Sequence, residues 1–369
     1  MGLEGAAGLD ELIDEVWSLF LDDLKQKEHP QVRTTFGDEV NLFVPQVRLL
    51  LPLHANPRFP ISLYTASYLG ARRNAYAIMR KLDMPPDFFW KFEYWTNERA
   101  FEVLSKVVNR IFREIMRTTK EGLLSVENAS TDPKEIHILL ALDECVECFG
   151  VSANHPICYY HAGTFTGIIS ALLGKELDCY ETACCATGSA KCEFMVVNKG
   201  TGEELEQYLN PATIDFALQK RLKSALDGQT RQSIGSEANL RYYHLVLLNS
   251  LITNPKLFSA SSYELGKEYG KNLVQFLAQY YQKQEHELLE VVAQYYRFLK
   301  HLQLELTQGT AVLRAAEVAE ISGLAKNADF LGFLLGELEG IVSVLRHEPL
   351  RCTEPVFEGN ELILKLKPQ

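Results

Sequence analysis

The sequence predicts an α+β fold, in which helices pack on an antiparallel sheet and the whole arrangement occurs twice. Three observations lead to this prediction. Apolar residues recur at helical spacing early in the chain, strand-like segments bounded by turn residues follow them, and groups of residues repeat further along. The chain has 369 residues, of which 47% are apolar, so it is long enough for two domains with separate cores.

The internal repeat consists of three ordered matches. Two of them have an offset of 198 residues, and the third has an offset of 173. The matching segments are 37–42 (GDEVNL) with 235–240 (GSEANL), 56–58 (NPR) with 254–256 (NPK), and 167–181 with 340–354. Chance similarity between two apolar helices is the alternative, but it does not explain why three matches occur in the same order. We therefore expect a tandem duplication with a shortened second copy.

The repeat divides the chain into four parts. We expect an N-terminal helical extension at 1–32, a first domain at 33–200, a helical connector at 201–230 and a second domain at 231–369. Within the extension, the segment 9–27 has the apolar stripe of an amphipathic helix, which must pack against another part of the protein.

In the first domain, two helices precede most of the predicted strands. The expected elements are helices over 63–82 and 100–118, a strand from 122, a strand over 135–142, a helix over 156–173, and a hairpin made of 176–185 and 191–197. Gly163 and Gly167 are four residues apart, so they face one side of their helix and allow a neighbouring helix to approach closely.

Composition excludes several classes of protein. The formal net charge is −11, which makes general nucleic-acid binding unfavourable because phosphate is repelled. The longest apolar runs are far shorter than a membrane-spanning helix requires, and the first residues lack the basic region and apolar core of a secretory signal. We therefore expect a cytoplasmic protein without a membrane span.

A cluster of cysteines is the sharpest chemical signal, because seven of the eight cysteines lie between Cys145 and Cys192. Cys158, Glu181, Cys184 and Cys192 provide three thiolates and a carboxylate, which suit zinc. Glu181 and Cys184 are three residues apart and would lie on opposite faces of a regular strand. They can share an ion only if the strand bulges or ends near 182–183.

Four protein ligands would close the coordination shell of such a zinc ion, which is typical of a structural site. Buried apolar thiols are the alternative interpretation. Cys145 and Cys148 form a competing CxxC pair that is either redox-active or lines the end of a strand. The second copy has no cysteine where the first has Cys184, so only the first copy is expected to bind metal in this way.

The chain resembles the 4-vinyl reductase domain family. The residues that carry the resemblance are His155-Pro-Ile-Cys158, Gly163, Gly167, Glu181-x-x-Cys184 and Gly188-x-x-x-Cys192. The resemblance implies zinc at Cys158, Glu181, Cys184 and Cys192, and a fold shared with a subunit of the TRAPP trafficking complex. It also implies a small apolar ligand and dimerisation, here either as a homodimer or as an intramolecular pseudo-dimer. The tandem arrangement resembles cyanobacterial-type members and implies a tetrapyrrole-like ligand.

Four residues are candidates for lining a ligand pocket. Trp90 and Tyr94 belong to the densest aromatic stretch, whose rings could stack on a flat ligand or simply fill a helix junction. His137 is placed in mid-strand, opposite to its isoleucine neighbours, where a solvent-facing histidine is the common alternative. Tyr160 follows Cys158 closely and could enter the pocket or support the zinc site.

The sequence contains no recognisable catalytic set and no nucleotide-binding motif. We therefore expect a non-enzymatic small-molecule-binding protein with a structural zinc, acting as a carrier, sensor or assembly protein. One alternative is an enzyme, or an enzyme subunit, acting on a vinyl tetrapyrrole. Another is a TRAPP-like interaction module without a ligand.

Overall fold

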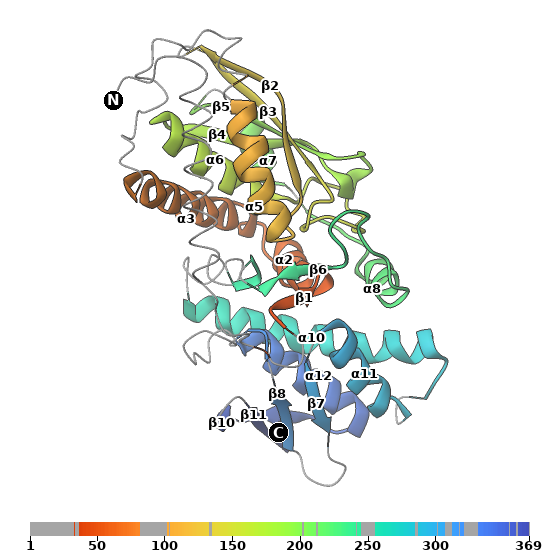
Figure 1. Cartoon of the computed structure of the whole chain (residues 1–369). Coiled ribbons are helices and arrows are strands. Elements are labelled where there is room, and N and C mark those ends of the chain that lie inside the picture. The colour runs from red at the N-terminus through yellow and green to blue at the C-terminus, as the bar shows by residue number, and fades with distance from the viewer. Residues whose placement is uncertain are drawn as a thin grey trace. The chain divides into compact units, whose positions relative to one another are not determined.

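The computed structural model describes most of the chain outside the N-terminal segment (Figure 1). The described residues are 33, 37–81, 102, 104–132, 135–200, 203–211, 213–240, 242–244, 255–284, 287–300, 302–306, 312–316, 318–320, 331–353, 355–358 and 361–368. They form helices and antiparallel sheets, which confirms the predicted α+β class. The expected helix at 9–27 lies outside the described residues. No helix of the described part is long and apolar enough to cross a membrane.

The chain separates into two compact units, each assembled from stretches that are distant in sequence. Unit 1 contains Asn56–Phe216 and Arg231–Gly235. Unit 2 contains Gln31–Ala55, Ala217–Thr230 and Ser236–Gln369. Segments from the early part of the chain therefore belong to both units.

Unit 1 contains a four-stranded antiparallel sheet with the order β2-β3-β5-β4. Its strands are β2 (Leu123–Asp132), β3 (Glu135–Asp143), β4 (Leu177–Ala183) and β5 (Cys192–Asn198). The alternation predicted for 135–142 is present, because Ile136 and Ile138 are buried while Glu135 and His137 are exposed. The hairpin of β4 and β5 is the one expected from the turn residues.

The helices of unit 1 lie beside this sheet (Figure 1). They are α3 (Phe59–Lys81), the π-helical turn η1 (Val108–Phe112), α5 (Arg113–Thr118), α6 (Tyr159–Leu173), the 3₁₀ turn η2 (Cys185–Thr187) and α7 (Glu203–Leu209). Helix α6 begins at Tyr159 rather than at Pro156, because the preceding residues are extended and Cys158 occupies the N-cap position. A later start places Cys158 at the exposed N–H groups of the helix end.

Helices α3 and α6 pack closely because glycines remove the side chains between them. A methyl group in place of the Gly163 hydrogen would lie 2.2 Å from the Tyr64 carbonyl oxygen. At Gly167 the corresponding distance to the Tyr68 carbonyl oxygen is 2.4 Å. The two glycines therefore do what their spacing predicted, and they fix the position of the helix that begins at Cys158.

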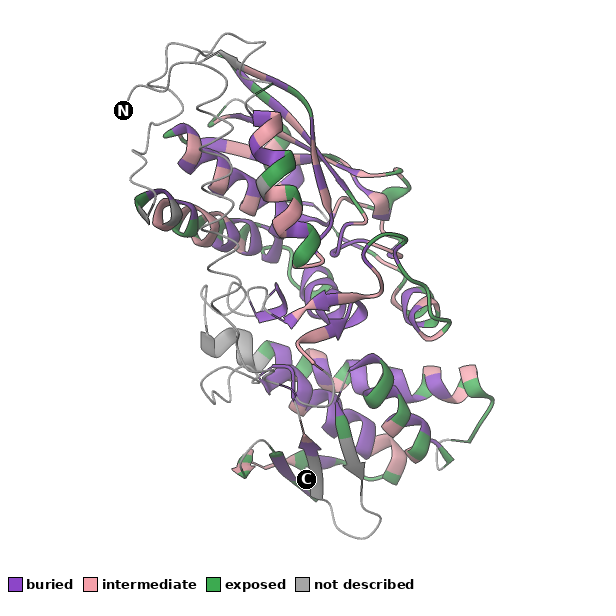
Figure 2. Cartoon of the chain, viewed as in Figure 1, coloured by how far each residue is buried: buried purple, intermediate pink, exposed green. Residues whose placement is uncertain are grey.

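Unit 2 has its own sheet and its own apolar core. Its helices are α2 (Phe43–Ala55), α8 (Leu218–Leu226), α10 (Pro255–Tyr281), α11 (Leu289–Leu299) and α12 (Gly332–Arg346). Its strands are β1 (Glu39–Asn41), β6 (Glu237–Asn239), β7 (Gln303–Leu306), β8 (Val312–Ala316), β9 (Leu350–Cys352), β10 (Val356–Glu358) and β11 (Glu361–Pro368). The main sheet has the order β10-β11-β8-β7, and β9 also pairs with β11. Helices α10, α11 and α12 contribute most of the buried residues (Figure 2).

A separate two-stranded ladder joins the repeated sequences of the first match. Strand β1 from GDEVNL pairs antiparallel with β6 from GSEANL, with Val40 opposite Ala238. The Leu42 N–H donates to the Ser236 carbonyl at 2.8 Å, and the Leu240 N–H donates to the Asp38 carbonyl at 2.9 Å. The two hydrogen bonds are exchanged by the same offset of 198 residues that relates the two segments.

Candidate metal centre

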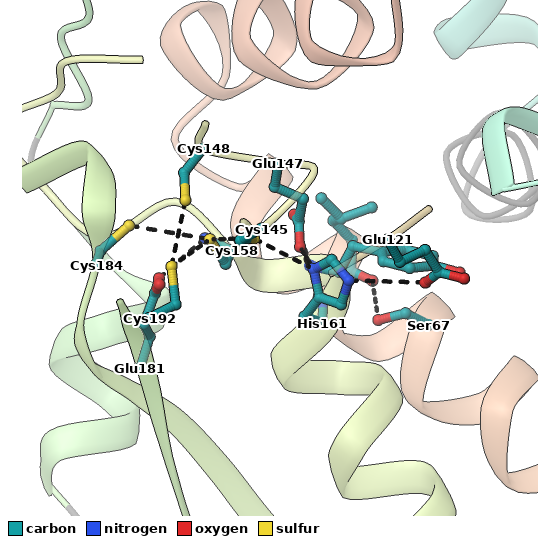
Figure 3. Close-up of polar contacts among 12 residues, drawn as sticks. Ser67, Glu121, Cys145, Glu147, Cys148, Cys158, His161, Glu181, Cys184 and Cys192 are labelled. Atoms are coloured by element: carbon teal, nitrogen blue, oxygen red, sulfur yellow. Dashed lines mark hydrogen bonds and ion pairs between the residues drawn. The ribbon is translucent and has the colours of Figure 1, made fainter. Parts of the chain in front are cut away.

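The four residues expected to bind zinc come together where α6 begins beside the β4–β5 hairpin (Figure 3). Cys158 is the N-cap residue of α6, and Glu181 lies near the end of β4. Cys184 lies between β4 and η2, and Cys192 is the first residue of β5. The hairpin turn and the helix start thus bring these residues close in space although they span 158–192 in the sequence.

A bulge allows Glu181 and Cys184 to face the same centre. The pairing of β4 with β5 shifts register between Glu181 and Ala183, and β4 ends at Ala183. The sequence required a bulge or a strand end at this place, since regular alternation would separate the two side chains. Thr182, which lies between them, is exposed, whereas both candidate ligands are buried.

The distances between the sulfur atoms suit coordination of a metal. One ligand atom from each of Cys158, Glu181, Cys184 and Cys192 lies within 4.8 Å of all the others, and all four residues are buried. The Cys158 Sγ is 3.9 Å from the Cys184 Sγ and 3.8 Å from the Cys192 Sγ. A tetrahedral zinc with Zn–S bonds of about 2.3 Å separates its sulfurs by about 3.8 Å.

Cys145 and Cys148 also belong to this cluster. The Cys145 Sγ lies 3.5 Å from the Cys158 Sγ, and the Cys148 Sγ lies 3.2 Å from the Cys192 Sγ. Cys145, Cys148, Cys158 and Cys192 form a second group that could hold a metal ion. Sequence reasoning treated the CxxC motif as a competitor of the other set. The structure places both sets at one centre, and the position of CxxC at the end of a strand was its available signal.

The Glu181 carboxylate lies in an environment that favours a nearby cation. Its Oε2 accepts a hydrogen bond from the Cys158 N–H at 3.0 Å. Its Oε1 is buried and has no hydrogen-bond partner among the described residues. Burial and the neighbouring Cys184 raise the pKa of the Glu181 carboxyl well above its ordinary value. A metal ion would occupy the open acceptor and stabilise the charged form.

A buried histidine and two glutamates border the thiol cluster (Figure 3). The Glu147 carboxylate accepts hydrogen bonds from the His161 ring Nδ1 and from the His161 N–H, and Glu121 lies 3.6 Å from the other ring nitrogen. Burial lowers the pKa of His161, but Glu147 and Cys145 outweigh it, so this pKa lies well above its ordinary value. Burial raises the pKa of Glu147 to about 7. Sequence reasoning did not single out these three residues.

The candidate ligand-pocket residues are placed apart from the thiol cluster or outside the description. His137 lies on β3 with a side chain that is 53% exposed, 3.7 Å from Glu135. Tyr160 is buried on α6, and its ring contacts the His161 ring edge to face. Trp90 and Tyr94 fall outside the described residues.

The described fold and site define an α+β domain with a buried, thiol-rich centre that could bind metal. Residues 139–198 match the model of the 4-vinyl reductase domain. The matched range includes all four expected zinc ligands together with Cys145 and Cys148. It covers the β3–β5 part of unit 1 and none of unit 2.

Parts of the chain are similar to curated proteins. It is 32% identical over 101 residues to the uncharacterized protein MJ0150 of Methanocaldococcus jannaschii, covering 26% of this chain and 56% of that protein. It is 39% identical over 51 residues to the bacteriochlorophyll synthase 23 kDa chain of Cereibacter sphaeroides, covering 14% of this chain and 25% of that one. The chain therefore spans about half and a quarter of the lengths of these relatives.

Two solved structures have weaker likenesses. The phenol-responsive sensory domain of the transcription activator PoxR with phenol matches with a TM-score of 0.34 at 17% identity, covering 46% of this chain and 78% of that domain. A trafficking protein particle complex subunit 3 from Naegleria fowleri, covalently bound to palmitic acid, matches with a TM-score of 0.27 at 15% identity, covering 52% and 95%. At these scores, nothing about the ligands of this chain follows from either structure.

Proposed function

We propose that this chain is a non-enzymatic small-molecule-binding protein whose first domain is held together by a structural zinc ion. The observation that carries the zinc assignment is the convergence of three thiols and one carboxylate, all buried, within 4.8 Å of one another. Thiolates favour zinc over magnesium or calcium, which prefer oxygen ligands. The ligand set therefore supports zinc by its chemistry as well as by its spacing.

The surroundings of the four ligands support a structural role for the ion. Each ligand residue is at most 5% exposed, so water has little access to a further coordination position. A shell of four protein ligands without a free position is typical of structural zinc. The ion would connect the N-terminus of α6 with both strands of the β4–β5 hairpin, and the helix N-terminus would stabilise the thiolate charge of Cys158.

Corresponding contacts in the two units support a tandem duplication. In unit 1, the Gly163 position of α6 meets the Tyr64 carbonyl of α3; in unit 2, the Gly336 position of α12 meets the Tyr263 carbonyl of α10. The residue pairs are those that the repeat aligns. A close glycine contact at equivalent positions is unexpected for two unrelated helix pairs, because it depends on both helices at once.

Hydrogen bonds at the helix ends follow the same correspondence. The Leu177 N–H donates to the Ser170 hydroxyl at 3.2 Å in unit 1, and the Leu350 N–H donates to the Ser343 hydroxyl at 3.1 Å in unit 2. Both pairs are related by the offset of 173 residues. We propose that unit 2 derives from a second copy of the same domain that has lost the metal ligands. Among the described residues, the groups that could hold a metal all lie in unit 1.

A small apolar or tetrapyrrole-like molecule is the ligand that we propose for the protein. The 4-vinyl reductase domain match and the partial similarity to a bacteriochlorophyll synthase chain support this class of ligand. We expect protein isolated from its own organism to show, in native mass spectrometry, an organic molecule in addition to metal. A tetrapyrrole would also give visible absorption that remains unchanged when reductant is added. A spectrum that changes on reduction would instead favour an enzyme acting on that ligand.

Substitution of a single zinc ligand tests the metal assignment. Apparent zinc-binding free energies of about 10–16 kcal/mol, shared among four ligands, give each ligand about 3 kcal/mol. We therefore expect Cys184→Ser or Glu181→Gln to weaken zinc binding on the order of 100-fold. Competition with a chromophoric chelator measures this affinity.

Glu193→Gln is the matched control for the glutamate substitution. Glu193 lies on the same hairpin and faces Lys191 at 3.8 Å, outside the thiol cluster. Its substitution is expected to leave zinc affinity unchanged. Wild-type protein that retains no zinc under reducing conditions, or ligand variants that bind zinc as tightly as the wild type, would contradict the assignment.

A further inference from the structure

We propose that the centre binds two metal ions, with the thiolates of Cys158 and Cys192 bridging them. This inference rests on the proposed zinc site and extends it by a second soft divalent ion. The first ion has the ligands Cys158, Glu181, Cys184 and Cys192, and the second has Cys145, Cys148, Cys158 and Cys192. Each ion therefore receives four ligands, and two of the six side chains are shared.

The two groups of ligands have the geometry of two tetrahedra that share an edge. The shared edge is the Cys158–Cys192 pair, whose Sγ atoms are 3.8 Å apart. This value equals the sulfur separation of about 3.8 Å in a tetrahedral zinc site. Cys184 lies 3.9 Å from the Cys158 Sγ on the side of the first ion. Cys145 lies 3.5 Å from the Cys158 Sγ on the side of the second.

The CxxC loop is held against the cluster by its own hydrogen bonds. The Val146 N–H donates to the Glu121 carbonyl at 2.9 Å, and the Phe149 N–H donates to the Cys145 carbonyl at 3.0 Å. Between the two cysteines, Glu147 accepts hydrogen bonds from the backbone N–H groups of Tyr160 and His161 at 3.3 and 3.0 Å. Glu147 thus fixes the loop to the first turn of α6, directly beside Cys158.

Charge balance also favours the second ion. One divalent ion with three thiolates and a carboxylate has a net charge of −2. Adding Cys145 and Cys148 as thiolates contributes two negative charges, and the second divalent ion cancels them. The enlarged cluster therefore buries no more net charge than the smaller one, while both added thiols, which are at most 1% exposed, obtain a cation in place of water.

Direct sulfur–sulfur contacts distinguish this arrangement from an iron–sulfur cluster. Iron–sulfur clusters contain inorganic sulfide between the metals, and the cysteines bind at the outside. Here the protein's own sulfurs occupy the bridging positions, because Cys158 and Cys192 each contact a further cysteine of the cluster. The structure therefore assigns thiolate bridges between two zinc-like ions.

The test uses the full-length chain, stripped of metal under reducing conditions and titrated with ¹¹³Cd²⁺ as the probe. Native mass spectrometry is expected to show two ions per wild-type chain, and ¹¹³Cd NMR is expected to show two resonances with mutual coupling through the shared sulfurs. The Cys145→Ser/Cys148→Ser double variant is expected to bind one ion. Cys352→Ser, which changes a cysteine of unit 2, is the control and is expected to bind two.

The outcomes separate this inference from the zinc site on which it rests. One ion in both the wild type and the double variant overturns the second ion and leaves the zinc site intact. No ion in the wild type overturns both. Two uncoupled resonances, or iron with acid-labile sulfide in protein from its own organism, overturn the bridged cluster. The wild-type stoichiometry and coupling decide the matter even if the double variant does not fold.

Discussion

Removal of the metal is expected to unfold the region around α6 and the β4–β5 hairpin while unit 2 remains folded. Structural zinc contributes about 10–16 kcal/mol in small zinc-binding peptides, whereas a whole domain is stable by only about 5–15 kcal/mol. The metal-free centre would also bury Glu181 and five thiols without a cation. Unit 2 contains a separate core and, among its described residues, no candidate metal group.

Hydrogen exchange measures this effect segment by segment. After treatment with chelator and reductant, amides of α6, β4 and β5 are expected to exchange at least about 100-fold faster, and added zinc should restore their protection. Amides of α10 and α12 provide the internal reference, since both helices belong to unit 2. Unchanged protection of α6 in metal-free protein would show that the centre does not stabilise the domain.

The substitution Gly163→Ala is expected to destabilise unit 1 by about 3 kcal/mol, because it inserts a methyl group into a closed helix contact. The new Cβ would lie 2.2 Å from the Tyr64 carbonyl oxygen and 2.1 Å from the Ser67 hydroxyl. The hydroxyl can rotate away, but the carbonyl belongs to the α3 backbone and cannot. Alanine favours a helix over glycine by only about 1 kcal/mol, so the steric overlap is the larger effect.

Thermal unfolding measures this change, with an expected decrease of the midpoint by about 10 °C. Gly200→Ala is the control, because nothing lies within 4 Å of its added methyl group. Its positive φ of 78° limits the expected cost to about 1 kcal/mol. Gly336→Ala, which meets the Tyr263 carbonyl at 2.0 Å, should destabilise unit 2 in the same way. A Gly163→Ala variant as stable as the Gly200→Ala variant would contradict close helix packing.

Much of the fold of unit 1 could be predicted from local sequence signals. Alternating burial marked β3, turn residues marked the β4–β5 hairpin, and two glycines four residues apart marked the closely packed face of α6. These signals work because side-chain direction along a strand or helix follows from backbone geometry alone. The start of α6 was placed three residues early, since the extended segment before Tyr159 is set by the position of Cys158.

The candidate site was predictable only in part. The expected ligands Cys158, Glu181, Cys184 and Cys192 do lie together, and the bulge that their spacing demanded is present. The CxxC pair gave no local signal that distinguished a redox motif, a strand end and a metal ligand. Its place beside Cys158 depends on the hydrogen bonds from Glu147 to the first turn of α6.

By itself, the sequence determined the α+β class, the order of helices and strands, and which residue types are available for metal binding. Only the tertiary structure decided that five cysteines and one glutamate meet at a single centre, and that segments from both ends of the chain contribute to unit 2. The physical reason is that periodicity and turn chemistry act between neighbouring residues, whereas contact between distant segments depends on how all elements pack at once.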